Sequence, residues 1–114
     1  MTGRYRTIRT STPRHYIKSY HALERHVTGE WPAPIALYLR GEIDERVLIE
    51  RARAPADLRA RREQLCEAFG FLGAAAETAG DRAVASDAYR RCVATEVTTF
   101  VEHTWARLRL AAMR

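Results

Sequence analysis

The residues of this 114-residue chain that could carry chemistry are four histidines, two cysteines and a pair of glutamates one helical turn apart. Zinc motifs usually place cysteines two to four residues apart, and helical metal sites repeat their histidines at four-residue spacing. Cys66 and Cys92 are 26 residues apart, and no two histidines are separated by four residues. We therefore expect neither a metal site nor a cofactor.

Catalysis by a nucleophile or by paired carboxylates is also poorly supported. A nucleophilic cysteine needs a base beside it, whereas Cys66 and Cys92 both fall at core-like helical positions, where a thiol acts as a small hydrophobic group. Glu63 and Glu67 are one turn apart, but the arginines at positions 59, 61 and 62 make this a typical solvated charged face. The sequence thus predicts no catalytic residues and a protein that is not an enzyme.

The composition predicts one all-α domain. The chain contains 19 alanines but only 11 isoleucines and valines together, and alanine favours helices whereas β-branched residues favour strands. A chain of this length normally forms a single domain. It contains no apolar run long enough for a transmembrane helix.

The positive charge is concentrated at the beginning of the chain. The net charge is +5, and residues 1–26 carry six basic side chains against one acidic side chain, while the rest of the chain is neutral. We expect residues 1–12 to form a basic flexible arm, with Arg4, Arg6, Arg9 and Arg14 as its cationic groups, before a single domain over residues 13–114. Such an arm, together with the first helix, could bind nucleic acid, which is the alternative function. The ratio of 18 arginines to one lysine looks like a coding bias.

The order of caps, turns and apolar spacings predicts about six helices. Thr12-Pro13 begins the first, over residues 13–28, and Trp31 follows in a Pro-rich connector where we expect it to anchor onto the body. A short helix over residues 34–39, closed by Gly41, precedes one capped by Asp44, and a long helix runs from Asp57 to about residue 79. The long helix carries an inward stripe, and these residues form it: Leu58, Leu65, Phe69, Leu72 and Ala76.

Two further helices follow the turn at Gly80-Asp81. Asp81 caps the first of them. The last begins with Thr99 and Glu102, a capping-box pattern, and one apolar face follows at spacings of four, three and four: Val101, Trp105, Leu108 and Ala112.

Residues 66–99 resemble one tetratricopeptide repeat (TPR), a 34-residue helix–turn–helix unit. The residues that match in type and spacing are Phe69, Leu72, Gly73, Gly80, Asp81, Ala85, Tyr89 and Cys92; Ala76 and Val97 depart from the pattern. Small residues at 73 and 85 let the paired helices approach, and Gly80 permits the reversal. Because Cys66 begins the repeat and Cys92 closes its second helix, we expect them to be neighbours, as reduced thiols in a cytoplasm.

A wider resemblance covers residues 15–110. The order of the Trp-Pro segment, a short helix pair, one good repeat and a closing Phe-Val-Glu helix resembles the C-terminal part of NlpI-like bacterial TPR lipoproteins. This resemblance implies a right-handed TPR-like helical-hairpin solenoid acting as a non-enzymatic adaptor for other proteins. Since no signal peptide is present, we expect a cytoplasmic location, and a periplasmic or envelope location only for a fragment of an exported precursor.

In TPR proteins the first helix of each pair lines a concave groove, which binds a peptide or protein. The corresponding positions here are Glu67, Gly70, Ala74, Glu77 and Thr78. We expect a mildly acidic groove suited to a peptide of basic character. The alternative is that a second copy of the chain covers this surface, because short solenoids often dimerise.

Overall fold

A computed structural model describes residues 30–114 of the chain, and these residues form five α-helices and no strand. The predicted all-α class is confirmed for this part of the chain. The helices are α2 (Ala33–Leu39), α3 (Glu45–Arg53), α4 (Leu58–Thr78), α5 (Arg82–Ala94) and α6 (Val101–Ala112). The basic arm and the predicted helix over residues 13–28 lie outside the described residues.

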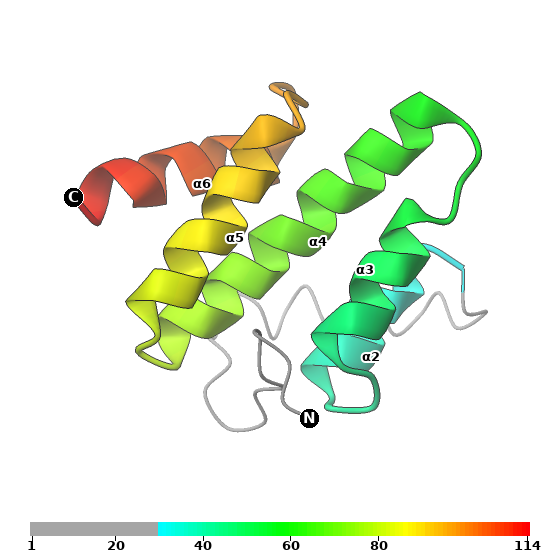
Figure 1. Ribbon diagram of the computed structural model, residues 1–114, viewed down its shortest axis with the longest axis horizontal. Helices are drawn as coiled ribbons and strands as arrows, with labels where there is room; N and C mark the ends of the chain where they lie inside the picture. The colour runs from blue at the N-terminus through cyan, green and yellow to red at the C-terminus, as the bar shows by residue number, and fades with distance from the viewer. Residues whose placement is uncertain (1–29) are drawn as a thin grey trace.

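The 21-residue helix α4 runs through the middle of the arrangement (Figure 1). It packs against α3 on one side and α5 on the other, while α6 contacts both α4 and α5. The helices α2 and α3 form a smaller pair of their own. Consequently α4 is the element through which the two ends of the described chain are joined.

Three of the predicted helix starts are confirmed. Asp44, Asp57 and Asp81 each accept a backbone N–H from the third residue of the following helix, over 2.9, 2.8 and 3.2 Å. Such bonds satisfy one of the N–H groups that a helix leaves unpaired at its beginning. Gly80 has a φ of +84°, a conformation that favours glycine, and it lets α5 turn back along α4.

The predicted capping box of the last helix is wrong. The N-cap of α6 is Phe100, one residue after Thr99, and no side chain caps the helix there. The Cβ atom of Glu102 instead lies where α6 crosses Gly70 of α4. The helix thus begins one residue later than expected, and its position against α4 is set by close backbone approach.

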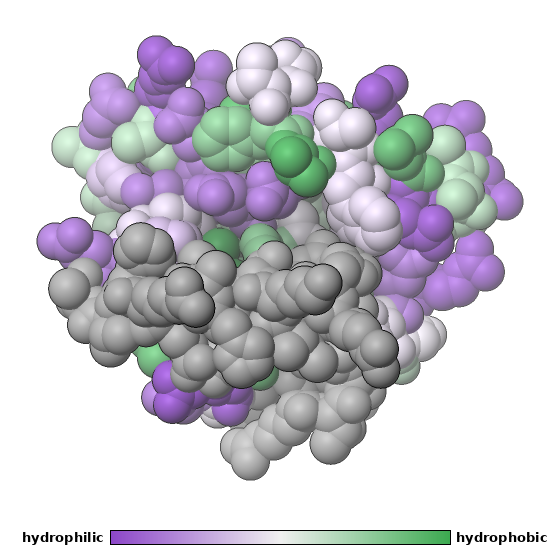
Figure 2. All heavy atoms as spheres, turned by 180° about the vertical axis from the view of Figure 1, so that it is seen from behind, coloured by the Kyte–Doolittle hydropathy of each residue, from purple (hydrophilic) through white to green (hydrophobic). Residues whose placement is uncertain are grey.

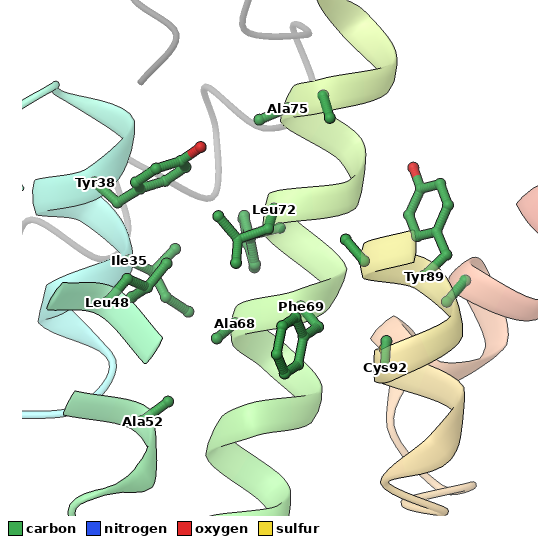
Figure 3. Packing of buried hydrophobic residues seen from close by; sticks show 14 of the residues in the cluster. Ile35, Tyr38, Leu48, Ala52, Ala68, Phe69, Leu72, Ala75, Tyr89 and Cys92 are labelled. Carbon is green, nitrogen blue, oxygen red and sulfur yellow. The ribbon is translucent and has the colours of Figure 1, made fainter. Parts of the chain in front are cut away.

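The core joins the α2–α3 pair to α4 and α4 to α5 (Figure 3). Ile35, Tyr38 and Leu48 point from α2 and α3 toward α4, where Ala68 and Leu72 face them. Of the predicted stripe of α4, Phe69, Leu72 and Ala76 are buried. The prediction that Leu58 belongs to this inward stripe is wrong. It is the first residue of α4 and is 57% exposed.

The hairpin of α4 and α5 has the close contacts predicted for it. A Cβ atom built on Gly73 would lie 2.5 Å from the ring of Tyr89, so only glycine fits without movement. Tyr89, Ala85 and Cys92 are fully buried. The Sγ atoms of Cys66 and Cys92 are 3.6 Å apart and both thiols are free, which confirms that they are neighbours.

Candidate interaction surface

A hydrogen-bonded network fixes α6 against the hairpin of α4 and α5. Tyr89 donates its hydroxyl proton to Glu77 over 2.8 Å, and the indole N–H of Trp105 donates to the Tyr89 hydroxyl over 3.3 Å. Arg109 pairs with the Glu77 carboxylate through its guanidinium and lies over the Trp105 ring, 5.8 Å from its centroid. One carboxylate therefore holds side chains from both neighbouring helices.

This network lowers the pKa of Glu77 below its usual value. The hydrogen bonds from Arg109 are the largest cause, and the bond from Tyr89 and the positive charges of Arg109 and Arg82 act in the same direction, against a smaller effect of burial. Glu77 therefore stays ionised at neutral pH. The pairing also raises the pKa of Arg109.

Beside this network, α6 presents apolar side chains to solvent. Val101 is 78% and Leu108 is 57% exposed, and they lie seven residues apart, on one face of the helix. Between them Trp105 is half-buried and Thr104 is exposed. Val101, Thr104, Trp105 and Leu108, with Thr99 and Phe100, line a shallow apolar hollow of about 270 Å³; we call these six residues the α6 face.

The sequence spacing predicts that Val101, Trp105 and Leu108 share one face of the last helix. It does not predict whether that face turns to the core or to solvent. His103 and Ala106 are the α6 residues that are buried against the other helices. On that side α6 approaches α4 closely where Glu102 crosses Gly70. Val101 and Leu108 point to solvent, whereas Phe100, Trp105 and Leu110 are partly buried against the core, and Figure 2 shows apolar groups reaching the molecular surface among polar ones.

The five predicted groove residues lie in different surroundings. Gly70 and Ala74 are buried, and a Cβ atom on Gly70 would come within 2.8 Å of Glu102. Glu67 accepts the Trp31 indole N–H over 2.8 Å and Glu77 belongs to the network above, whereas Thr78 is exposed. Both carboxylates at this surface are thus already hydrogen-bonded within the chain, and partner binding in the groove stays a prediction.

The bond between Trp31 and Glu67 confirms that this tryptophan anchors onto the body. Burial raises the pKa of Glu67 more than the bond from Trp31 lowers it, and the charges of Glu102 and Glu63 raise it further. The surroundings of Glu67 therefore destabilise its ionised form, whereas those of Glu77 stabilise it. Its bond ties the segment before α2 to the first half of α4.

The two cysteines are enclosed at the junction of three helices. Both thiols are 0% exposed, and the Cys92 thiol also lies 3.2 Å from the carbonyl oxygen of Cys66 and 3.4 Å from that of Glu102. The hydrogen bond to Cys66 and burial raise the pKa of the Cys92 thiol. A protonated, enclosed thiol is a poor nucleophile, which fits a packing role.

A second hollow, of about 480 Å³, lies between the beginning of α4 and the loop before α6. Leu58, Arg62 and Thr98 are among its lining residues, and Arg59 at its edge pairs with Glu63. Within residues 30–114 there is no cluster of three or more His, Cys, Asp or Glu side chains that could hold a metal ion. No helix in this part of the chain is both long and apolar enough to cross a membrane.

Comparison with models of known protein families finds no family that matches the chain. No solved structure matches it either.

Proposed function

We propose that this chain is a non-enzymatic interaction module, a right-handed TPR-like solenoid of about six helices that acts as an adaptor by binding a protein or peptide. The α6 face carries the proposal. Val101 and Leu108 hold apolar surface in water on a helix whose position is fixed by the ion pair of Glu77 and Arg109. Contiguous exposed apolar surface of this kind commonly marks a binding site.

The order of helix contacts supports the TPR-like part of the proposal. In helical repeat arrays each helix pair contacts only its neighbours along the chain. Here α3 packs on α4, α4 pairs with α5, and α6 packs on both members of that pair. A TPR hairpin needs small residues at the positions of Gly73 and Ala85 and a large one at that of Tyr89. Here Gly73 lies against Tyr89 at the α4–α5 contact, and Ala85 is fully buried in α5.

The proposal places the partner on the α6 face and not primarily on residues 67–78. Glu67 and Glu77 are bonded to Trp31 and Arg109, so a partner that used these carboxylates would have to break contacts within the chain. The α6 face requires no such exchange. Its apolar atoms lose only water when a partner covers them, and this contributes roughly 25 cal/mol of favourable free energy per Å² of apolar surface buried.

A comparison of variants in a pull-down from the source organism's lysate tests this proposal. The double variant Val101→Glu/Leu108→Glu should lose a protein partner that the unmodified chain retains through washes at about 150 mM and about 500 mM salt. Leu58→Glu is the matched control, because Leu58 is exposed to the same 57% as Leu108 but lies on α4. It should retain the partner.

Two results would contradict the proposal. One is a partner that all three proteins retain equally, or that Leu58→Glu loses as well. The other is retention of nucleic acid alone, released by the higher salt and unaffected by Val101→Glu/Leu108→Glu. The second result would favour binding by the basic arm, since phosphate contacts weaken steeply with salt.

A further inference from the structure

We infer that the partner of the α6 face is an amphipathic helix with an acidic flank, lying along α6. This inference rests on the proposed function and adds the chemistry of the partner to it. Three observations support it: the shape of the α6 face, the distribution of charge beside it and the arrangement of the side chains that hold it.

The shape of the α6 face fits a helix. Continued by the exposed Ala111 and Ala112, the stripe that begins at Val101 covers about three helical turns, or roughly 17 Å. Small side chains, Thr104, Ala111 and Ala112, alternate along it with Val101 and Leu108 and are all exposed, which leaves grooves between apolar ridges. Ridges of a second helix pack into grooves of this kind. The described residues offer no sheet edge to which an extended peptide could add.

One wall of the α6 face is rigid. The Trp105 ring is held by its bond to the Tyr89 hydroxyl and by the Arg109 guanidinium above it. Arg109 is itself fixed by Glu77. A partner side chain placed against Trp105 would therefore meet a surface that needs little reordering, which lowers the entropic cost of binding.

The charge beside the α6 face is positive. Arg107 is exposed and follows Thr104 by three residues on the same flank of α6, and the exposed Arg114 lies two residues beyond the end of the helix. Neither arginine forms an ion pair within residues 30–114 that would neutralise it. The only acidic side chain of α6, Glu102, lies on the other flank, against Gly70. An acidic flank on the partner would complement this arrangement.

The same charges disfavour a second copy of the chain as the occupant. When two identical helices pair antiparallel about a two-fold axis, equal flanks face each other. Two copies of α6 would therefore bring together the flanks that carry Arg107. An acidic helix gains from these charges, whereas a copy is repelled by them.

Two synthetic peptides of about 15 residues test the inference. Both have leucines at helical spacing i, i+3, i+7; one has glutamates on its flanks and the other has lysines in the same places. Titration calorimetry with the full chain, together with amide chemical shifts in α6, measures binding. We expect the glutamate peptide to bind about tenfold more tightly than the lysine peptide at low salt, with the difference shrinking as salt rises.

A charge exchange on the protein is the decisive variant. Arg107→Glu/Arg114→Glu should reverse the preference, so that the lysine peptide binds more tightly. Arg51→Glu/Arg53→Glu, an equal charge change at two exposed positions of α3, should leave the preference unchanged. Far-UV circular dichroism confirms that each variant remains helical.

Several outcomes would overturn the inference. These are equal binding of both peptides, a preference that Arg107→Glu/Arg114→Glu does not alter, or shifts confined to helices other than α6. A dimer in sedimentation experiments that Val101→Glu dissociates would assign the α6 face to a second copy. If neither peptide binds while the lysate partner still depends on Val101 and Leu108, this inference fails and the proposed function stands; if that dependence is absent too, both fail.

Discussion

Glu67 and Glu77 lie ten residues apart on α4, and their surroundings shift their pKa values in opposite directions. Glu77 has the Arg109 guanidinium and the Tyr89 hydroxyl as donors, so its pKa is lowered. Glu67 has one neutral donor, Trp31, and is more deeply enclosed, so its pKa is raised. An ionised glutamate therefore stabilises the fold at position 77 and destabilises it at position 67.

These shifts predict opposite effects of two matched substitutions. Because the folded-state pKa of Glu77 lies below that of the unfolded chain, its stabilising contribution is complete above the unfolded value and is lost as the pH falls through the folded value. Glu77→Gln should lower the free energy of unfolding at pH 7 by about 1 kcal/mol, since the ion pair is partly exposed. The loss should be smaller at about pH 3.

Glu67→Gln supplies the comparison. A raised folded-state pKa in a carboxyl group means that stability is greatest at low pH and falls as the pH rises through that value. Glutamine removes the charge and keeps an oxygen that accepts the Trp31 N–H, so the variant should be at least as stable as the unmodified chain at pH 7. Urea unfolding at the two pH values measures both effects; losses of equal size at pH 7 for both variants would contradict the assignment.

At the scale of elements, two glycines of α4 set the distances to its neighbours. Gly73 lies against the Tyr89 ring of α5, and Gly70 lies against Glu102 of α6. A single added methyl group at either position would force one helix pair apart. The two contacts can therefore be tested separately.

Gly73→Ala should destabilise the chain by about 2 kcal/mol or more. A Cβ atom there would lie 2.5 Å from the ring of Tyr89, whose hydroxyl is held by Glu77 and Trp105, and overpacking of this kind costs about 1–3 kcal/mol. Alanine's helix preference returns at most about 1 kcal/mol. Gly70→Ala should cost less, because its contact at 2.8 Å is with Glu102 at the edge of the fold. Thermal unfolding measures both, and a greater loss for Gly70→Ala would contradict the contacts.

The helices themselves could be predicted from the sequence because their signals are local. Asp44, Asp57 and Asp81 are caps whose partners lie three residues away, and Gly80 marks the turn by its own backbone preference. The neighbouring positions of Cys66 and Cys92 follow from the register of one hairpin, so they too could be predicted.

The surface of α6 could not be predicted in the same way. Its apolar spacing defines a face, but the side that turns to the core depends on non-local contacts. The side with His103 and Ala106 is the one that is buried where α6 packs on α4 and α5. Likewise, the sequence predicts an acidic surface from Glu67 and Glu77. It does not show that both carboxylates are bonded within the chain, because their partners Trp31 and Arg109 are 36 and 32 residues away.

At the scale of the whole molecule, charge is distributed unequally between the two ends of the described chain. Residues 30–57 carry six acidic and four basic side chains, whereas residues 82–114 carry six arginines and three acidic side chains. The end that presents the α6 face is therefore the positive one. An acidic partner would be drawn toward this end before any contact forms.

The two ends should nevertheless unfold together. In repeat proteins, units that contact only their neighbours can unfold one after another, but here α4 packs against α3, α5 and α6. Trp31 is bonded near the middle of α4 through Glu67, and Trp105 reaches its last turn through Tyr89 and Glu77. The two tryptophans thus report on opposite ends of the described chain while depending on one helix.

Single-tryptophan variants measure this coupling. In Trp105→Phe the fluorescence of Trp31 should change at the same urea concentration as the far-UV circular dichroism, to within about 0.2 M, and Trp31→Phe should behave likewise for Trp105. Comparing two signals within one variant removes any difference in stability between the variants. If Trp31 responded at lower urea than the helix signal, the α2–α3 end would be unfolding alone, and α4 would transmit less between the two ends than its contacts indicate. A partner bound on α6 would then stabilise only its own end. Coincident transitions mean that binding at α6 raises the unfolding midpoint reported by Trp31 as well.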